Sequence, residues 1–151
     1  MEPDSQQARI LYDLCLGQHL AVLATANGTA PYASLVAIAI TQELRQLYFA
    51  TPRTTRKAAN LAGNQKVSLL LDNRSNQLTD FSRAAAATLT GHAVELQGDE
   101  RDRRLSFFLA RHPHLSGFTS SPGTVLYEVT ITRISLVTRF QQVIDYHLTH
   151  E

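Results

Sequence analysis

The residues with the clearest chemistry are the hydroxyl and cationic side chains between Thr51 and Lys57. Arg56 and Lys57 are adjacent cations at the start of a predicted helix, and Thr51, Thr54 and Thr55 place hydroxyl groups just before them. A helix N-terminus has unpaired N–H groups and a partial positive charge, so it favours an anion. An arginine can hold two phosphate oxygens, and a lysine adds a second charge. The pattern indicates a site for a phosphate monoester on a nucleotide-like cofactor; a solvated helix start with ordinary capping threonines is the alternative.

No other motif supplies a catalytic group. The chain has neither a glycine-rich phosphate loop nor a zinc motif of the His-Glu-x-x-His type. His112 and His114 lie close together but lack an obvious third ligand, and no histidine–aspartate pair accompanies Ser120 and Ser121. We therefore predict no metal site, and if the protein is an enzyme, a cofactor carries its chemistry.

The composition sets the class of protein. The 151 residues fit one domain, and 44% hydrophobic and 18% charged residues are typical of a globular chain. A net charge of +1 gives no basis for a nucleic-acid partner. Cys15 is the only cysteine, which excludes a disulfide within the chain and fits a reducing compartment. No apolar run reaches the roughly 20 residues that span a bilayer, so we expect a cytoplasmic protein with no membrane segment.

Hydrophobic periodicity and turn signals predict a mainly β fold with peripheral helices. Six strands are expected, at His19–Thr25, Tyr32–Ile40, Leu44–Ala50, Val67–Leu71, Ala84–Leu96 and Val125–Arg139. Helices are expected at Ser5–Leu16, Thr55–Ala62 and Asp99–Arg111, and loops at Asp72–Arg83 and His114–Gly123. Antiparallel hairpin signals and few helices favour a small antiparallel barrel over a βαβ sheet.

Three strand features refine this prediction. The strand Tyr32–Ile40 is apolar on both faces, as expected of a barrel strand covered outside by a helix or a partner subunit. The apolar phase of the last strand shifts after Ile131, which predicts a bulge near Thr132 and Arg133. Gly91 inside the fifth strand marks a bulge or a close approach by a ligand.

The order of several segments resembles the FMN-binding split-barrel family, also called the pyridoxamine 5'-phosphate oxidase-like family. The matching segments are Leu23–Thr25, Gly28, Pro31–Val36, Leu47–Thr51, Arg56–Leu61, Asn64–Leu70 and Ala87–Ala93. The resemblance covers residues 20–96 well and the final strand loosely. It implies a six-stranded antiparallel split β-barrel that forms a homodimer, with FMN at the subunit interface.

The same resemblance implies eight cofactor-binding residues. Thr51, Arg56 and Lys57 would hold the FMN phosphate; Ser34, Leu35 and Val36 would lie along the isoalloxazine ring; and Tyr48 and Phe49 would position the ribityl chain. The phosphate assignment agrees with the anion site inferred above from charge and helix geometry.

Departures from the family pattern limit the reaction. Ser34 and Ala39 stand where the oxidases have an arginine and a lysine that contact FMN, Ala86 replaces a flavin-contacting glutamine, and the chain has no tryptophan. We therefore expect an FMN-binding oxidoreductase with an unknown small-molecule substrate or electron donor, not a true pyridoxamine phosphate oxidase. The alternative is a non-catalytic flavin- or haem-binding or electron-transfer module. The deazaflavin F420 ranks below FMN because Arg53 is the only further cation near the phosphate site.

Overall fold

A computed structural model describes residues 5–139 and 142–150 of the chain. Its strands are β1 (Leu20–Asn27), β2 (Ala30–Ala37), β3 (Ala39–Ile40), β4 (Gln46–Pro52), β5 (Lys66–Asp72), β6 (Ala85–Glu95), β7 (Thr124–Thr138) and β8 (Gln142–His147). Its helices are α1 (Gln6–Gly17), α2 (Arg56–Gly63), α3 (Asp80–Arg83), α4 (Gly98–Arg111), the 3₁₀ turn η1 (Pro113–Leu115) and α5 (Ser116–Ser120).

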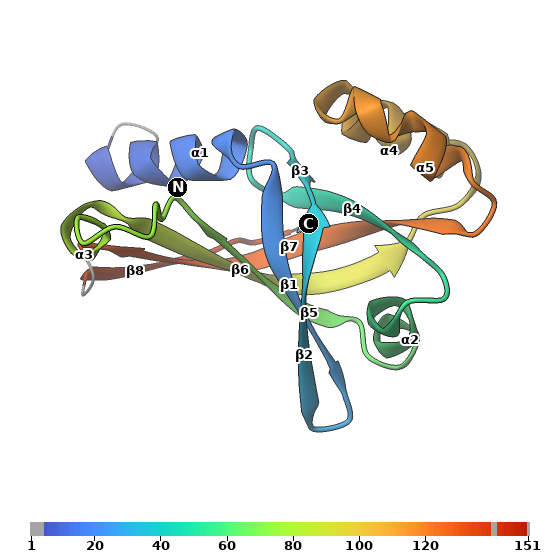
Figure 1. The fold of residues 1–151 in the computed structure, drawn as a ribbon, viewed down its shortest axis with the longest axis horizontal. Coiled ribbons are helices and arrows are strands. Elements are labelled where there is room, and N and C mark those ends of the chain that lie inside the picture. Colours follow the sequence, from blue (N-terminus) through green and yellow to red (C-terminus); the bar gives the residue numbers. More distant parts are fainter. Residues whose placement is uncertain (1–4, 140–141, 151) are drawn as a thin grey trace.

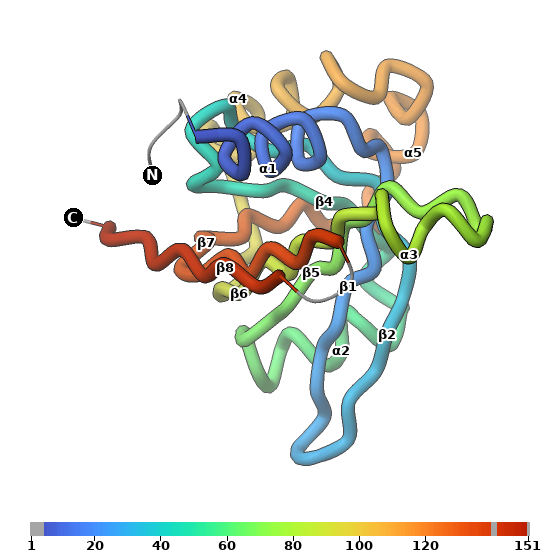
Figure 2. Tube along the Cα trace, turned by 90° about the vertical axis from the view of Figure 1, so that its left-hand side faces the viewer, coloured from blue at the N-terminus to red at the C-terminus, as the bar shows by residue number. Residues whose placement is uncertain are grey.

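All eight strands belong to one antiparallel sheet in the order β2-β1-β5-β6-β7-β4-β3, with β8 added to β7 (Figure 1). The order begins with β2 and ends with β3, which are separated in the chain by Ile38 alone. The sheet must therefore curl until its two ends approach each other; Figure 2 shows its path as a tube. This confirms the expected mainly β split-barrel fold.

The expected count of six strands is wrong. The predicted strand Tyr32–Ile40 is divided at Ile38 into β2 and β3, and the backbone N–H of Ile38 donates to His19 O (3.0 Å). A further strand, β8, forms a hairpin with the second half of β7. The two segments predicted to be loops contain short helices, namely α3 in the first and most of η1 and α5 in the second.

The bulge predicted in the last strand is confirmed. Thr90 on β6 pairs with Arg133, but the next residue, Gly91, pairs with Ile131, so Thr132 is the extra residue on β7. Gly91 lies at this irregularity, as predicted, and the group that approaches it is the backbone of β7, because a Cβ atom there would lie 2.0 Å from Thr130 O. Glycine is required at this position by the neighbouring backbone, not by its own torsion angles.

Two hydrophobic clusters lie on opposite faces of the curled sheet. The larger one fills the interior and is closed at one side by α1, whose Leu11, Leu14 and Cys15 are buried in it. Ser5 caps α1 by accepting a hydrogen bond from the backbone N–H of Ala8 (3.1 Å). The smaller cluster lies outside the barrel, where α4 packs on the sheet (Figure 1). Within the described residues, no helix is long and apolar enough to cross a membrane.

Candidate cofactor-binding site

The start of α2 is fixed by a chain of hydroxyl groups. Thr55 is the N-cap and accepts a hydrogen bond from the backbone N–H of Ala58 (3.3 Å). Its hydroxyl lies 2.9 Å from Pro52 O and 2.9 Å from the hydroxyl of Thr51. Since Thr55 donates to the carbonyl, Thr51 donates to Thr55. These bonds place Arg56 and the following lysine in the first helical turn, where the N–H groups point toward solvent.

Arg56 and Lys57 are not neutralised by the protein. No carboxylate pairs with either side chain in the part of the chain that the structure describes. The guanidinium of Arg56 lies over the ring of Tyr32, with its central carbon 5.3 Å from the ring centroid. Neighbouring Arg53 differs, because it pairs with Glu95 at 2.5 Å. Two adjacent cations at a capped helix start therefore remain available to an anion.

Arg56 borders a groove of about 700 Å³ between α2 and the β1–β2 hairpin, and Lys57 follows it on the same helical turn. Its lining residues are Asn27, Ala30, Pro31, Tyr32, Thr54, Thr55, Arg56, Ala59 and Asn60. Asn60 fixes the helix to β1, because its amide nitrogen donates to the hydroxyl of Thr25 (3.0 Å, both side chains buried). The groove is within the size range of small-ligand sites.

Ser34, Leu35 and Val36 lie on β2 and alternate between its faces. Val36 is buried in the core, whereas the side chain of Leu35 is 63% exposed on the outer face. Ser34 shares a face with Tyr32, and its hydroxyl oxygen is buried without a hydrogen-bond partner among the described residues. β2 is also an end strand of the sheet, so the backbone groups along its outer edge have no strand partner. This stretch offers polar groups that a ligand could satisfy.

Tyr48 and Phe49 lie on opposite faces of β4, as neighbours in a strand must. Phe49 is fully buried inside the barrel, where its ring stacks on Tyr127 with 5.1 Å between centroids. Tyr48 lies outside the barrel beneath α4, and its hydroxyl donates to Glu128 Oε2 (2.8 Å). Burial and the carboxylate of Glu128 raise the pKa of Tyr48 well above its usual value, so its proton stays in this bond. The structure thus separates these two side chains from each other and from the α2 groove.

Thr51 and Ala39 are also covered by protein. The side chain of Thr51 is buried and reaches the groove only through Thr55. Ala39 pairs in register with Tyr48 and packs beneath α4 in the outer cluster, at the place where the resemblance expects a lysine.

The sequence interpretation did not assign Tyr32 and Asn60 to the site. Tyr32 precedes Ser34 by two residues, so strand alternation places it on the same face. Asn60 follows Arg56 by four residues, which is the spacing of neighbours on one helix face. Both spacings are visible in the sequence, although the contact between the hairpin and α2 is not.

Two of the histidines and serines considered earlier, His112 and Ser120, have structural roles. His112 is buried and its Nε2 donates to Ile38 O (2.6 Å), while the Ser120 hydroxyl donates to Gly117 O (3.1 Å). Burial lowers the pKa of His112, which favours the neutral ring. Within residues 5–139 and 142–150, no group of three or more His, Cys, Asp or Glu side chains could hold a metal ion.

Comparisons with known proteins identify the fold. The heme binding protein from Mycobacterium smegmatis superimposes with a TM-score of 0.82 at 16% identity, over 95% of this chain and 58% of that one. General Stress Protein 26 from Bacillus anthracis gives 0.68 at 19% identity, over 94% and 98% of the two chains. A FAD-binding protein from Mesorhizobium loti gives 0.68 at 17% identity, over 85% and 90%. This chain thus spans little more than half the length of the mycobacterial protein, and no curated protein matches its sequence.

These likenesses define the class of protein as a split barrel. The sequence profile described as pyridoxamine 5'-phosphate oxidase matches residues 11–138, which is most of the chain. The protein belongs to the pyridoxamine 5'-phosphate oxidase family, as the resemblance predicted.

Proposed function

We propose that the protein is an FMN-binding flavoprotein and that the groove beside α2 receives the FMN phosphate. The observation that carries this proposal is the pair of unneutralised cations, Arg56 and Lys57, on the capped first turn of α2. The helix dipole, the free N–H groups of the first turn and these two charges all favour a doubly charged phosphate. The buried threonine Thr51 acts indirectly in this proposal, because it orients the cap residue Thr55.

The isoalloxazine ring is proposed to lie along β2 at Ser34, Leu35 and Val36. The unpaired hydroxyl of Ser34 and the unpaired edge of β2 support this position, since both provide hydrogen-bonding groups that the protein itself leaves unused. Tyr48 and Phe49 would act by holding β4 between the two hydrophobic clusters. Bound FMN would supply hydride or single-electron transfer, and the chain would bind and orient it.

A homodimer is proposed to cover the outer face of β2. Leu35, Val22 and Leu70 lie side by side in register across β2, β1 and β5, and the side chains of Leu35 and Leu70 are 63% and 37% exposed. Such a row of aliphatic side chains on a sheet face is a typical contact surface between subunits. Changing Leu70 to lysine should convert the dimer to a monomer in light scattering, because it places a charge in that contact.

We propose oxidoreductase activity toward a small molecule, without assigning pyridoxamine phosphate as the substrate. Ser34 and Ala39 lack the cationic groups expected of the true oxidases, and Ala39 is covered by α4. A FAD-binding protein shares the fold, which supports a flavin; a heme binding protein shares it too, so haem is the competing cofactor. Turnover with a reduced nicotinamide and a dye acceptor separates an enzyme from a pure binding module.

The test is a cofactor titration of purified protein. FMN fluorescence should be quenched on binding, and the double variant Arg56→Ala/Lys57→Ala should bind FMN at least about 100-fold more weakly, since each charged hydrogen bond contributes about 1.5–3 kcal/mol. Arg53→Ala is the matched control, because Arg53 is already paired with Glu95 and should change affinity little. Circular dichroism verifies that each variant is folded. A protein that takes up haem but not FMN, or a double variant with unchanged FMN affinity, would refute the proposal.

A further inference from the structure

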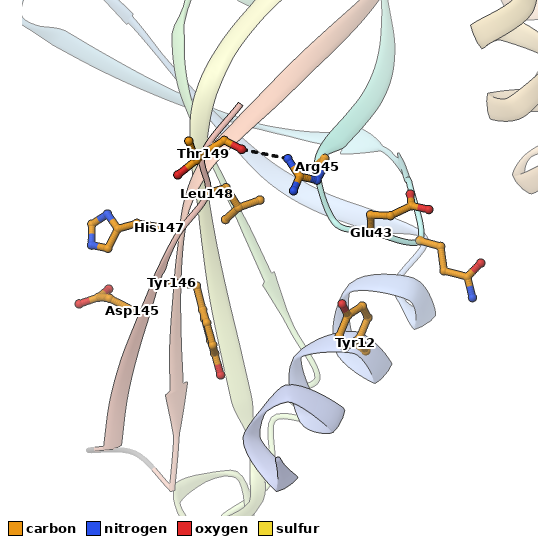
Figure 3. A pocket seen from close by; sticks show the side chains of 9 residues that line it. Tyr12, Glu43, Arg45, Asp145, Tyr146, His147, Leu148 and Thr149 are labelled. Carbon is orange, nitrogen blue, oxygen red and sulfur yellow. Dashed lines mark hydrogen bonds between the residues drawn. The ribbon is translucent and has the colours of Figure 1, made fainter. Parts of the chain in front are cut away.

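A second cavity, of about 780 Å³, lies between α1, the turn after β3, and β8 with the segment that follows it (Figure 3). Its lining residues are Tyr12, Gln42, Glu43, Arg45, Asp145, Tyr146, His147, Leu148 and Thr149. None of them lines the groove beside α2, so this cavity is separate from the proposed FMN site.

The turn before β4 supplies two opposite charges to the lining of this cavity. Leu44 has a φ of +58°, a conformation that a leucine seldom adopts, and its side chain is 0% exposed in the core. The hydroxyl of Thr41 holds the turn by accepting hydrogen bonds from the backbone N–H groups of Arg45 (3.2 Å) and Gln46 (3.1 Å). Because Leu44 turns inward, its neighbours Glu43 and Arg45 both lie at the surface and line the cavity. Arg45 reaches toward Thr149, whereas the carboxylate of Glu43 points away from Arg45 (Figure 3).

Neither charge is neutralised by the protein. One guanidinium nitrogen of Arg45 donates to Thr149 O (3.0 Å), which orients the side chain and leaves its remaining N–H groups for another acceptor. Over the described residues, no ion pair forms at Arg45 or Glu43. Asp145, by contrast, pairs with Arg133 at 3.3 Å. One cation and one anion are therefore available in the same cavity.

The side walls of the cavity are aromatic. Tyr12 on α1 and Tyr146 on β8 are half-buried and face the space between these two elements, and Leu148 lies between Tyr146 and Arg45 (Figure 3). All three pack against the interior hydrophobic cluster, so their positions are fixed from behind. Burial raises the pKa of Tyr146, which keeps its ring neutral. Paired aromatic walls favour a planar ring between them.

We infer that this cavity binds a free aromatic α-amino acid. Its carboxylate would pair with Arg45 and its ring would lie between Tyr12 and Tyr146. Its ammonium group would pair with Glu43, whose exposed side chain would rotate toward Arg45 on binding. A simple anion would leave Glu43 unpaired and a simple amine would leave Arg45 unpaired, so a zwitterion fits the two charges of the lining better than either. The inference does not depend on flavin binding.

Isothermal titration calorimetry with three ligands tests this inference on the whole protein. L-Phenylalanine should bind most tightly; 3-phenylpropionate lacks the ammonium group and phenethylamine lacks the carboxylate, so each should bind roughly tenfold more weakly. Arg45→Gln should weaken phenylalanine and phenylpropionate but not phenethylamine. Glu43→Gln should weaken phenylalanine and phenethylamine but not phenylpropionate. Tyr146→Leu should weaken all three.

His147→Gln is the matched control, since Figure 3 shows its ring directed away from the space between the tyrosines, and it should bind phenylalanine as the natural chain does. Arg45 and Glu43 are exposed, so their variants should fold even if Tyr146→Leu does not. Absence of phenylalanine binding at millimolar concentration, equal affinity for the three ligands, or unchanged affinity in both charge variants would overturn the inference. Self-association that both charge variants abolish would also overturn it, because the cavity would then hold a second copy of the chain.

Discussion

Replacing His112 by phenylalanine removes one hydrogen bond at a junction of the fold while keeping a ring of similar size. His112 follows α4, and its Nε2 donates to Ile38 O (2.6 Å) at the break between β2 and β3. The ring also contacts Phe108, with 5.0 Å between centroids. Because His112 and Ile38 are both almost fully buried, water would not replace the lost donor.

The expected loss of unfolding free energy follows from that geometry. A buried carbonyl left without a donor costs about 1–3 kcal/mol, a large part of the about 5–15 kcal/mol that stabilises a typical domain. Urea unfolding followed by circular dichroism should therefore show a lower midpoint with an unchanged slope. His114→Gln is the control: this neighbouring histidine is exposed, and its change should stay within about 0.5 kcal/mol.

The pH dependence of stability is a second test of the role of His112. Burial lowers the pKa of His112, and the nearby charges of Arg111, His19 and His114 act in the same direction. The unfolded chain then binds a proton at a higher pH than the folded chain does. The contribution of His112 is complete above its unfolded pKa, near 6.5, and is lost as the pH falls below that value. The His112→Phe variant should therefore lose less unfolding free energy than the natural chain as the pH falls below that value.

Two results would refute this reasoning. The first is a phenylalanine variant as stable at neutral pH as the natural chain, which would mean that the bond to Ile38 O contributes nothing. The second is an unchanged loss of stability below pH 6.5 in that variant, which would assign the effect to other groups.

Three further predictions concern the elements around the site. Thr55→Ala removes the cap of α2 and should lower the unfolding free energy by about 1 kcal/mol, measured by urea titration; no change would contradict the cap. Gly91→Ala sets a methyl group against Thr130 O and should cost about 1–3 kcal/mol or more, seen as a lower melting temperature, whereas an unchanged one would argue against the close contact. The thiol of Cys15, whose pKa burial raises to about 12, should resist maleimide labelling until the protein unfolds; rapid labelling of the native protein would contradict its burial.

Local chemistry was sufficient to predict much of the fold. The phase shift after Ile131 and the glycine at position 91 both indicated the bulge at Thr132, because each signal lies in single residues of the sequence. The approach of the β7 backbone to Gly91 was not predicted, because it depends on the pairing of the two strands. The strand β8 was not predicted, since its inward apolar alternation is short, with Ile144 and Tyr146 alone within the strand, and it depends on the β7 edge for pairing. Short helices such as α5 were missed for a related reason: their position is determined by contacts with β7.

The candidate site was predictable where its chemistry is local. Arg56 and Lys57 could be placed on the first turn of α2 from the capping threonines alone. The opposite placement of Tyr48 and Phe49 follows from strand alternation, but only the packing of α4 shows that both faces of β4 are covered. The cavity lined by Arg45 could not be predicted, because it depends on elements that are distant in the sequence.

The bulge at Thr132 also marks the place where β7 changes partners. Before it, residues 124–130 pair with β4; after it, residues 133–138 pair with β8. Inward-facing positions are odd-numbered before the bulge, up to Ile131, and even-numbered after it, from Ile134. A single inserted or deleted residue in this strand would therefore move the inward-facing side chains of one half to the outer face. An insertion compensated by a nearby deletion would leave both halves as they are. The inward and outward alternation of β7 thus depends on the number of residues on each side of the bulge. Substitutions along β7 should therefore be tolerated more readily than changes in its length.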